Sequence, residues 1–294
     1  WSCTTATTPT VSGLAPGTCN VTVTNMSTSC VSAQATFTIV AAIPLCPAMY
    51  HTCAVPRNVS SQFGTGFIGT SGNRATVAIH SDFTINNNFE FRFADVAIDP
   101  NVKIIVAANC TLTIQSGSHL FGCTNMWDGI YLSSSTSQLI INGSTIEDAM
   151  QAVFSSSAAR FVVSGSIFDR NLVSIHAENG SYSTSSVTGT SFRCTGSTLK
   201  PPYGSQRSSN HIELNNVSTI TIGGGAINNF ENSNIGIFST DSYLNLSYNI
   251  FSNHTNCIRS INANLNSLNR LYATQNTFSN SSYGVYMQGG DLST

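Results

Sequence analysis

The sequence predicts an all-β chain, most of which forms a right-handed parallel β-helix, and two observations predict this fold. In residues 139–177 one unit occurs twice: an aliphatic run, then Asn-Gly-Ser or Ser-Gly-Ser, then an apolar residue. The apolar residues Ile146 and Phe168 lie 22 positions apart, and each is followed seven positions later by another aliphatic, Val153 or Ile175. Units of about 20 residues with short alternating strands are typical of solenoids, which bury apolar faces only by stacking units.

The same spacing continues downstream, with Phe192, Phe251 and Phe278 each leading to an aliphatic residue at the seventh following position. The unit around Gly223–Gly225 fits less well. We expect about seven coils between Val102 and Gln288, with units of 22 to 27 residues and one long insertion. The predicted inward ladder is Ile146, Phe168, Phe192, Ile227, Phe251 and Phe278, and the predicted polar turn stack is Ser144, Ser166, Asn249 and Asn276. The alternative is a β-sandwich with evenly spaced strands, which does not require a fixed offset.

Composition limits the classes of partner. Only 8% of the 294 residues are charged, 41% are hydrophobic and the net charge is −2. A surface of Ser, Thr, Asn and Gly is typical of secreted β-rich proteins, and the charge argues against nucleic-acid or anionic-membrane partners. No apolar stretch approaches the roughly 20 residues that span a bilayer. The chain opens without a signal peptide and ends without a polar cap, so we expect it to be a window on a longer protein.

Nine cysteines without a Cys-x-x-Cys pair indicate an oxidising compartment rather than metal binding. Cys46 and Cys53 lie close enough in sequence to clip an entry segment, and Cys110 and Cys123 to lock a coil. The remaining disulfide candidates are Cys3, Cys19 and Cys30, which sit together near the start. Cys194 and Cys257 have no local partner.

Residues 1–41 differ in character from the rest. Trp1-Ser2, Ala6–Pro9, Ser12–Thr18, Val21–Thr24, Cys30 and Phe37–Ile39 together resemble the SprB-type immunoglobulin-like repeat of large surface adhesins of type IX-secreting bacteria. The resemblance implies a multidomain extracellular protein displayed at a cell surface, and it does not imply an enzyme. We therefore expect a partial immunoglobulin-like β-sandwich repeat at 1–41, a linker and N-terminal cap at 42–75, and the β-helix at 76–294.

Candidate chemistry is concentrated at one place. The 22-residue spacing stacks Glu147 and Asp148 on Asp169 and Arg170, the densest ionic group of the chain. Parallel β-helices host polysaccharide-cleaving enzymes, which need carboxylates converging from adjacent coils or around Ca²⁺. Because Arg193-Cys194 and Asn228-Asn229 follow, the carboxylates do not continue into a cleft. We interpret the group as a surface ion pair, with Ca²⁺ binding or catalysis as alternatives.

One long loop, residues 194–211, carries Lys200, Tyr203 and Arg207, which are candidate binding residues because long loops on rigid scaffolds often bind ligands. A tolerated insertion is the other interpretation. The sequence thus favours a non-enzymatic, extracellular structural or adhesive protein with no cofactor, a stiff segment of a large adhesin or fibre. Its expected partners are neighbouring domains or copies of the same protein, carbohydrate or cell-surface ligands, with filament assembly as one outcome. The alternative is a β-helix that binds or degrades polysaccharide.

Overall fold

The computed structural model describes residues 17–22, 24, 31–39, 51–52, 66–263, 269–289 and 291–293. The chain divides into two compact units, Trp1–Pro44 and Leu45–Thr294, each described here by itself. In the first unit β1 (Gly17–Val21) and β2 (Ala35–Ile39) pair antiparallel, with a further bridge between Thr24 and Val31. These two strands lie inside the expected immunoglobulin-like repeat, and residues 1–16, 23, 25–30 and 40–41 of that repeat lie outside the described residues.

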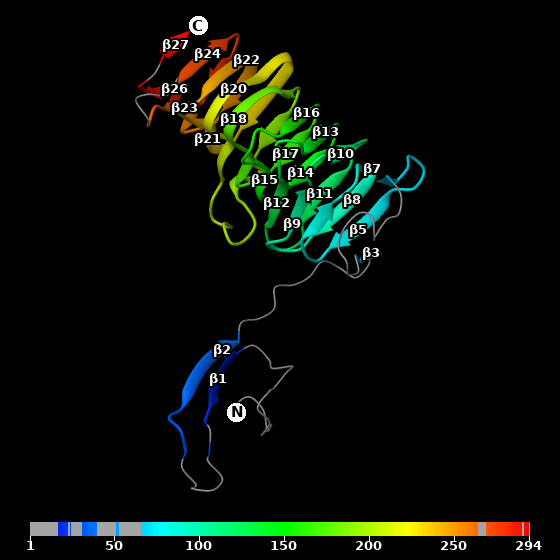
Figure 1. The fold of residues 1–294 in the computed structure, drawn as a ribbon. Helices are drawn as coiled ribbons and strands as arrows, with labels where there is room; N and C mark the ends of the chain where they lie inside the picture. Colours follow the sequence, from blue (N-terminus) through cyan, green and yellow to red (C-terminus); the bar gives the residue numbers. More distant parts are fainter. Residues whose placement is uncertain are drawn as a thin grey trace. The chain divides into compact units, whose positions relative to one another are not determined.

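The second unit is a parallel β-solenoid of about nine coils, as predicted (Figure 1). Each coil contributes three short strands, and equivalent strands of successive coils pair in parallel. The pairing register therefore defines three faces, which we name A, B and C. The strands β18, β20 and β22 run through corners and serve more than one face.

Face A contains β3 (His51–Thr52), β5 (Ala75–Ile79), β8 (Ala94–Ile98), β11 (His119–Gly122), β14 (Thr145–Glu147), β17 (Ile167–Asp169), β19 (Ser191–Arg193), the end of β20 (Ser208–Glu231), the end of β22 (Tyr243–Ser252) and β25 (Thr277–Ser279). Face B contains β6 (Phe83–Ile85), β9 (Lys103–Val106), β12 (Trp127–Leu132), β15 (Ala149–Ser155), the start of β18 (Val173–Thr188), the start of β20, β21 (Ser233–Thr240), β23 (Asn256–Ile261) and β26 (Tyr283–Gln288). Face C contains β4 (Phe67–Ile68), β7 (Phe89–Arg92), β10 (Thr111–Gln115), β13 (Gln138–Asn142), β16 (Arg160–Ser164), the end of β18, the middle of β20, the start of β22, β24 (Arg270–Thr274) and β27 (Asp291–Ser293).

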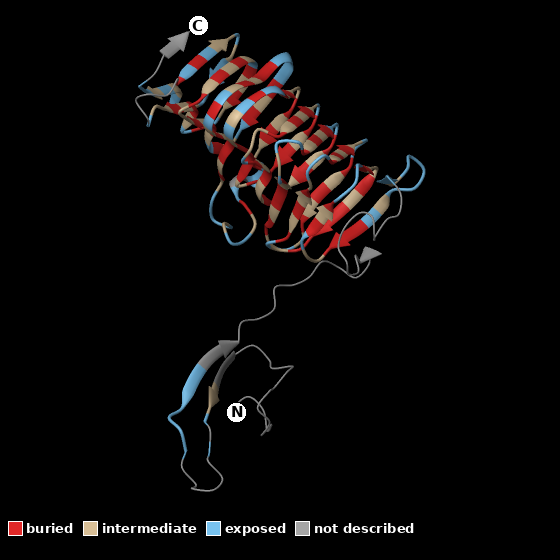
Figure 2. Ribbon diagram, in the orientation of Figure 1, coloured by how far each residue is buried: buried red, intermediate tan, exposed pale blue. Residues whose placement is uncertain are grey.

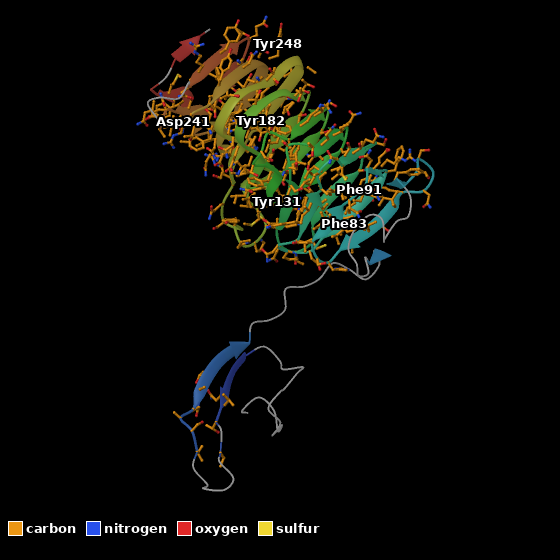
Figure 3. The ribbon with its side chains drawn as sticks, in the orientation of Figure 1. Phe83, Phe91, Tyr131, Tyr182, Asp241 and Tyr248 are labelled. Carbon is orange, nitrogen blue, oxygen red and sulfur yellow. The ribbon has the colours of Figure 1, made fainter. Side chains whose placement is uncertain are left out.

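The core lies inside the three faces. Along most strands buried residues alternate with partly exposed ones, because successive side chains of a strand point to opposite sides (Figure 2). Phe83 and Phe91 are fully buried in the first coils (Figure 3). Two coils lie upstream of those expected from Val102 onward, since Phe83 pairs with Ile104 and Phe89 with Leu112. The expectation of about seven coils therefore holds for the range from Val102 to Gln288, and the solenoid begins upstream of it.

An aromatic stack runs through face A, from Phe168 to Phe192, Phe230, Phe251 and Phe278. Successive ring centroids are 5.2, 4.7, 4.7 and 5.4 Å apart, with interplanar angles of 19° or less. Ile146 continues the ladder before Phe168, as predicted. Each buried ring contributes roughly 1.5–3 kcal/mol by removing apolar surface from water.

The predicted place of Ile227 in this ladder is wrong, because Phe230 occupies it. Between faces C and A, β20 spans five positions from Gly223 to Asn228 where β22 spans two from Ser247 to Asn249. The three additional residues bulge outward and leave Ile227 51% exposed. Counting seven positions from Phe230 then gives Ile237, which has the expected place on face B.

A polar ladder accompanies the rings at the corner between faces C and A. The Asn228 amide donates to Asn249 Oδ1, and the Asn249 amide donates to Asn276 Oδ1, each over 2.9 Å. In earlier coils Ser144 N–H donates to Ser166 Oγ at the equivalent place. The predicted stacking of these short polar residues is confirmed. They satisfy backbone groups that would otherwise be buried without a partner, which is costly.

The structure contradicts one of the predictions made for the cysteines. Cys110 is a free, buried thiol, so the predicted bond between Cys110 and Cys123 is wrong. Cys194 and Cys257 are also free and buried, in line with their lack of a local partner. The candidates Cys3, Cys30, Cys46 and Cys53, and the side chain of Cys19, lie outside the described residues.

Candidate functional site

The four predicted charged residues lie together at the corner between faces A and B. Glu147 and Asp169 end β14 and β17 and are register partners. The Arg170 guanidinium contacts Glu147 Oε2 at 2.8 Å and Asp148 Oδ1 at 3.1 Å. His119 Nε2 lies 2.7 Å from Glu147 Oε1. The spacing of the repeat therefore does bring two carboxylates of one coil against the charged pair of the next.

Asp148 is not a surface group, which corrects the interpretation as a surface ion pair. Its side chain is 0% exposed, and Lys200 Nζ lies 2.9 Å from its Oδ2 atom. Asp148 also has φ of 61°, a left-handed conformation that Asp and Asn tolerate better than most residues. The Lys200 side chain comes from the long insertion, so that insertion seals the carboxylate from solvent.

Burial and charge shift the two neighbouring carboxylates in opposite directions. Burial raises the pKa of Asp148, more than the nearby Lys200 and Arg170 lower it. Burial also acts to raise the pKa of Glu147, but the hydrogen bond and charge of His119 and the charge of Arg170 outweigh it and leave that pKa below its usual value. Opposed shifts of this kind are typical of acid–base pairs. Here, however, both carboxylates already contact cationic side chains: Arg170 contacts both, and Lys200 contacts Asp148.

Asp169 completes this ionic cluster and is also fully engaged. Arg193 Nε lies 3.1 Å from Asp169 Oδ2, and Thr195 donates to Asp169 from its backbone N–H at 2.9 Å and its hydroxyl at 2.6 Å. Thr195 begins the short 3₁₀ turn η1 (Thr195–Ser197) of the insertion. The ionic cluster therefore anchors the insertion to the body of the solenoid.

The three loop candidates serve the same anchoring, rather than projecting toward a ligand. Lys200 Nζ also donates to the backbone oxygens of Gly122 and Cys123, at 2.6 and 2.9 Å. Tyr203 packs against a small apolar cluster that includes Leu199 of the insertion. Arg207 donates to Asn234, Asn253 and Thr255 in later coils. Figure 1 shows this insertion as the yellow-green loop beside the solenoid.

A second feature, which the sequence reasoning missed, lies on the outer side of face B. One outward position is in register through eight coils and carries Ile105, Tyr131, Phe154, His176, Glu213, Phe238, Arg259 and Tyr286. We name this row the outer ladder. Its signal in the sequence is that Phe154, His176, Arg259 and Tyr286 each follow directly after an inward aliphatic identified by the seven-residue offset.

The residues of the outer ladder support one another. The rings of Tyr131 and Phe154 are 5.1 Å apart, and those of Phe154 and His176 are 5.2 Å apart. The Arg259 guanidinium lies 5.7 Å from the ring centroids of both Phe238 and Tyr286. Such contacts hold the rings in fixed orientations without burying them fully.

The centre of the outer ladder is polar. His176 Nε2 lies 3.0 Å from Glu178 Oε1 and 4.0 Å from Glu213 Oε1, while the Gln151 amide reaches His176 Nδ1 at 2.9 Å. Asn210 donates to Glu213 Oε2 at 2.9 Å. Two carboxylates and several amides thus surround one histidine between aromatic stretches. His176 and Glu178 can be placed together from the sequence, as residues facing each other across a turn, although a solvent-exposed histidine is the simpler expectation. The contact with Glu213 cannot, because the insertion separates His176 from this register partner.

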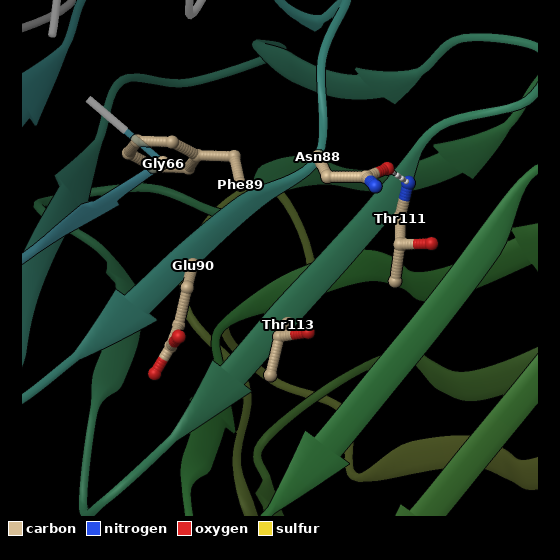
Figure 4. A pocket seen from close by; sticks show the side chains of 6 residues that line it. All are labelled: Gly66, Asn88, Phe89, Glu90, Thr111 and Thr113. Atoms are coloured by element: carbon tan, nitrogen blue, oxygen red, sulfur yellow. Dashed lines mark hydrogen bonds between the residues drawn. The ribbon is translucent and has the colours of Figure 1, made fainter. Parts of the chain in front are cut away.

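A shallow hollow of about 400 Å³ lies on the outer side of face C, in the first coils. It is lined by Gly66, Asn88, Phe89, Glu90, Thr111 and Thr113 (Figure 4). Asn88 Oδ1 accepts a hydrogen bond from the Thr111 backbone N–H, and Glu90 is paired with Gln115. The polar groups of the hollow are therefore largely occupied by one another.

Comparisons with known proteins found no match for this chain, whether among family models, curated proteins or solved structures. Within the described ranges, no group of three or more His, Cys, Asp or Glu side chains is arranged to hold a metal ion. Among the same residues, no helix has the length and hydropathy needed to cross a membrane.

Proposed function

We propose that the chain is a non-enzymatic structural and adhesive segment of an extracellular surface protein. The observation that carries the proposal is the continuity of its interior. The aromatic stack runs through five successive coils and the Asn ladder through three, and β-strands of neighbouring coils pair along the solenoid. Such an interior makes a stiff rod, in which each coil is held by its neighbours on both sides.

The exterior supports the same proposal. Only 8% of the residues are charged, and Ser, Thr and Asn recur at the outward positions of faces A and C. In the densest charged group of the described region, the Asp148 carboxylate is buried and contacts Lys200 of the insertion. The resemblance of residues 1–41 to adhesin repeats adds the expectation of type IX export, display at the cell surface and neighbouring domains or copies as partners.

Two experiments test the proposal. An antibody against residues 66–263 should label intact cells that produce the protein, and external protease should remove the signal. In single-molecule pulling, the solenoid should resist force and then unfold in discrete steps. A signal found only after cell lysis would refute surface display, and unfolding without measurable resistance would refute the rod. Release of reducing ends from a polysaccharide panel, abolished by Asp169→Asn, would instead assign a degradative enzyme.

A further inference from the structure

We infer that the outer ladder on face B is a binding surface for an extended, uncharged polysaccharide chain. This inference rests on the proposed function and names the ligand class through which the rod would adhere. The carrying observation is a row of aromatic side chains, Tyr131, Phe154, Phe238 and Tyr286, held in register on one face with a polar centre between them.

The aromatic residues are concentrated on this face. The corresponding outward rows of the other faces consist mainly of small, polar or aliphatic side chains. On face C the row is Phe67, Glu90, Thr113, Ile140, Val162, Ser186, Thr221, Asn245, Tyr272 and Ser293, with an aromatic residue only near each end. On face A it is Asp95, His119, Thr145, Ile167, Ser191, Asn229, Ile250 and Thr277.

Geometry favours a long, narrow ligand. Eight residues at a coil spacing of about 4.8 Å make a row roughly 34 Å long and one side chain wide. A stable protein–protein interface is instead a compact patch of about 800 Å² per partner. The coil spacing is comparable to the length of one pyranose ring in an extended chain, so successive sugars can meet successive coils.

The chemistry of the row suits sugar rings. The C–H face of a pyranose stacks on an aromatic ring, because the partly positive hydrogens meet the negative face of the ring. Between the rings, the carboxylates of Glu178 and Glu213 can accept hydrogen bonds from hydroxyl groups. The amides of Gln151 and Asn210 both donate and accept, which matches the dual character of a sugar hydroxyl.

The charged side chains on this surface argue against a charged polymer as the ligand. Lys103 Nζ lies 3.3 Å from Asp128 Oδ2 and 4.6 Å above the Tyr131 ring. At the other end, Arg259 lies between two aromatic rings, and at the centre His176 faces two carboxylates. Positive and negative side chains therefore both occur along the row, so these residues give no field of one sign that would attract a polyanion.

The test is affinity electrophoresis of the whole chain in native gels that contain mannan, laminarin or hydroxyethyl cellulose, with polygalacturonate as a charged comparison. We expect at least one neutral polysaccharide to retard the protein. Phe154→Ala and Tyr286→Ala should each weaken that retardation about tenfold, because each removes one stacking platform. Tyr286 is 40% exposed, so its truncation leaves the fold intact. The thermal unfolding midpoint of each variant checks this.

The matched control is Tyr248→Ala, which removes a 43% exposed tyrosine at the corner between faces C and A and should leave retardation unchanged. The inference is overturned by three results: no retardation in any neutral gel, retardation by polygalacturonate alone, or equal retardation of wild type and both ladder variants. If intact cells are labelled but the gels show no retardation, this inference fails and the proposed function stands. If the gels show retardation but intact cells are not labelled, the proposed surface display fails and the inference of polysaccharide binding stands.

Discussion

Replacing Phe230 and Ile227 by alanine, one at a time, tests the register of the irregular coil. Phe230 is fully buried, and its ring lies 4.7 Å from the rings of both Phe192 and Phe251. A Phe→Ala change in a core costs about 3–5 kcal/mol through lost burial and the cavity left behind. Two stacked partners place this residue well inside that range. We expect Phe230→Ala to lower the free energy of unfolding by about 4 kcal/mol.

Ile227 gives the matched control, because its side chain is 51% exposed in the bulge. Exposed substitutions usually change stability by less than about 0.5 kcal/mol, and we expect this of Ile227→Ala. Urea unfolding followed by far-UV circular dichroism measures both, with equal m-values required for the comparison. Phe230→Leu should recover more than half of the loss, since it restores most of the volume. A large cost for Ile227→Ala together with a small one for Phe230→Ala would place Ile227 in the core and refute the register.

Three other predictions concern buried polar groups. Burial lowers the pKa of His211 from 6.5 to about 3. Between pH 6.5 and pH 3, His211 therefore binds a proton in the unfolded chain but not in the folded chain. Stability should therefore fall as the pH falls from 6.5 toward 3, by about 2 kcal/mol at pH 5 from this residue. His211→Gln should remove that part of the pH dependence of the free energy of unfolding, measured by urea titrations at several pH values. An unchanged slope of this free energy against pH would contradict the prediction. Lys200→Met leaves the buried Asp148 carboxylate with one cationic partner fewer. We expect the free energy of unfolding to fall by about 3 kcal/mol and proteolysis within residues 194–207 to become faster. Adding Asp148→Asn should restore protection, and continued cleavage would contradict the anchoring. Asn249→Ala should cost about 3 kcal/mol in urea unfolding by breaking the polar ladder, whereas Asn249→Ser, the residue type of earlier coils, should cost clearly less.

The repeat could be predicted because its signal is local. Ile146, Phe168 and their partners seven positions on face the same interior, so burial selects apolar residues at a fixed spacing. Ser144 and Asn249 were recognisable for a related reason, since a tight corner demands short polar side chains that bond to the backbone.

What could not be predicted depends on how many residues each corner holds. The bulge after Gly223 displaces Ile227 by three positions. Because of the insertion, Ile212 occupies the position on face B that was expected for Leu199. A sequence repeat shows that a coil is longer, but not at which corner the excess lies. The same uncertainty hid the outer ladder, because Glu213 meets His176 only once the insertion is assigned to the corner after β19. The burial of Asp148 was missed since it depends on where Lys200 folds back.

The insertion between β19 and β20 changes how force and unfolding can travel along the rod. In a simple solenoid each coil touches only its two neighbours, so fraying at one end can proceed coil by coil. Here Lys200 reaches back to Gly122 at the end of β11, and Arg207 reaches forward to Thr255 after β22. Six coils are thereby cross-linked in parallel with their ladder, and they should open together as one cooperative block while the outer coils fray independently.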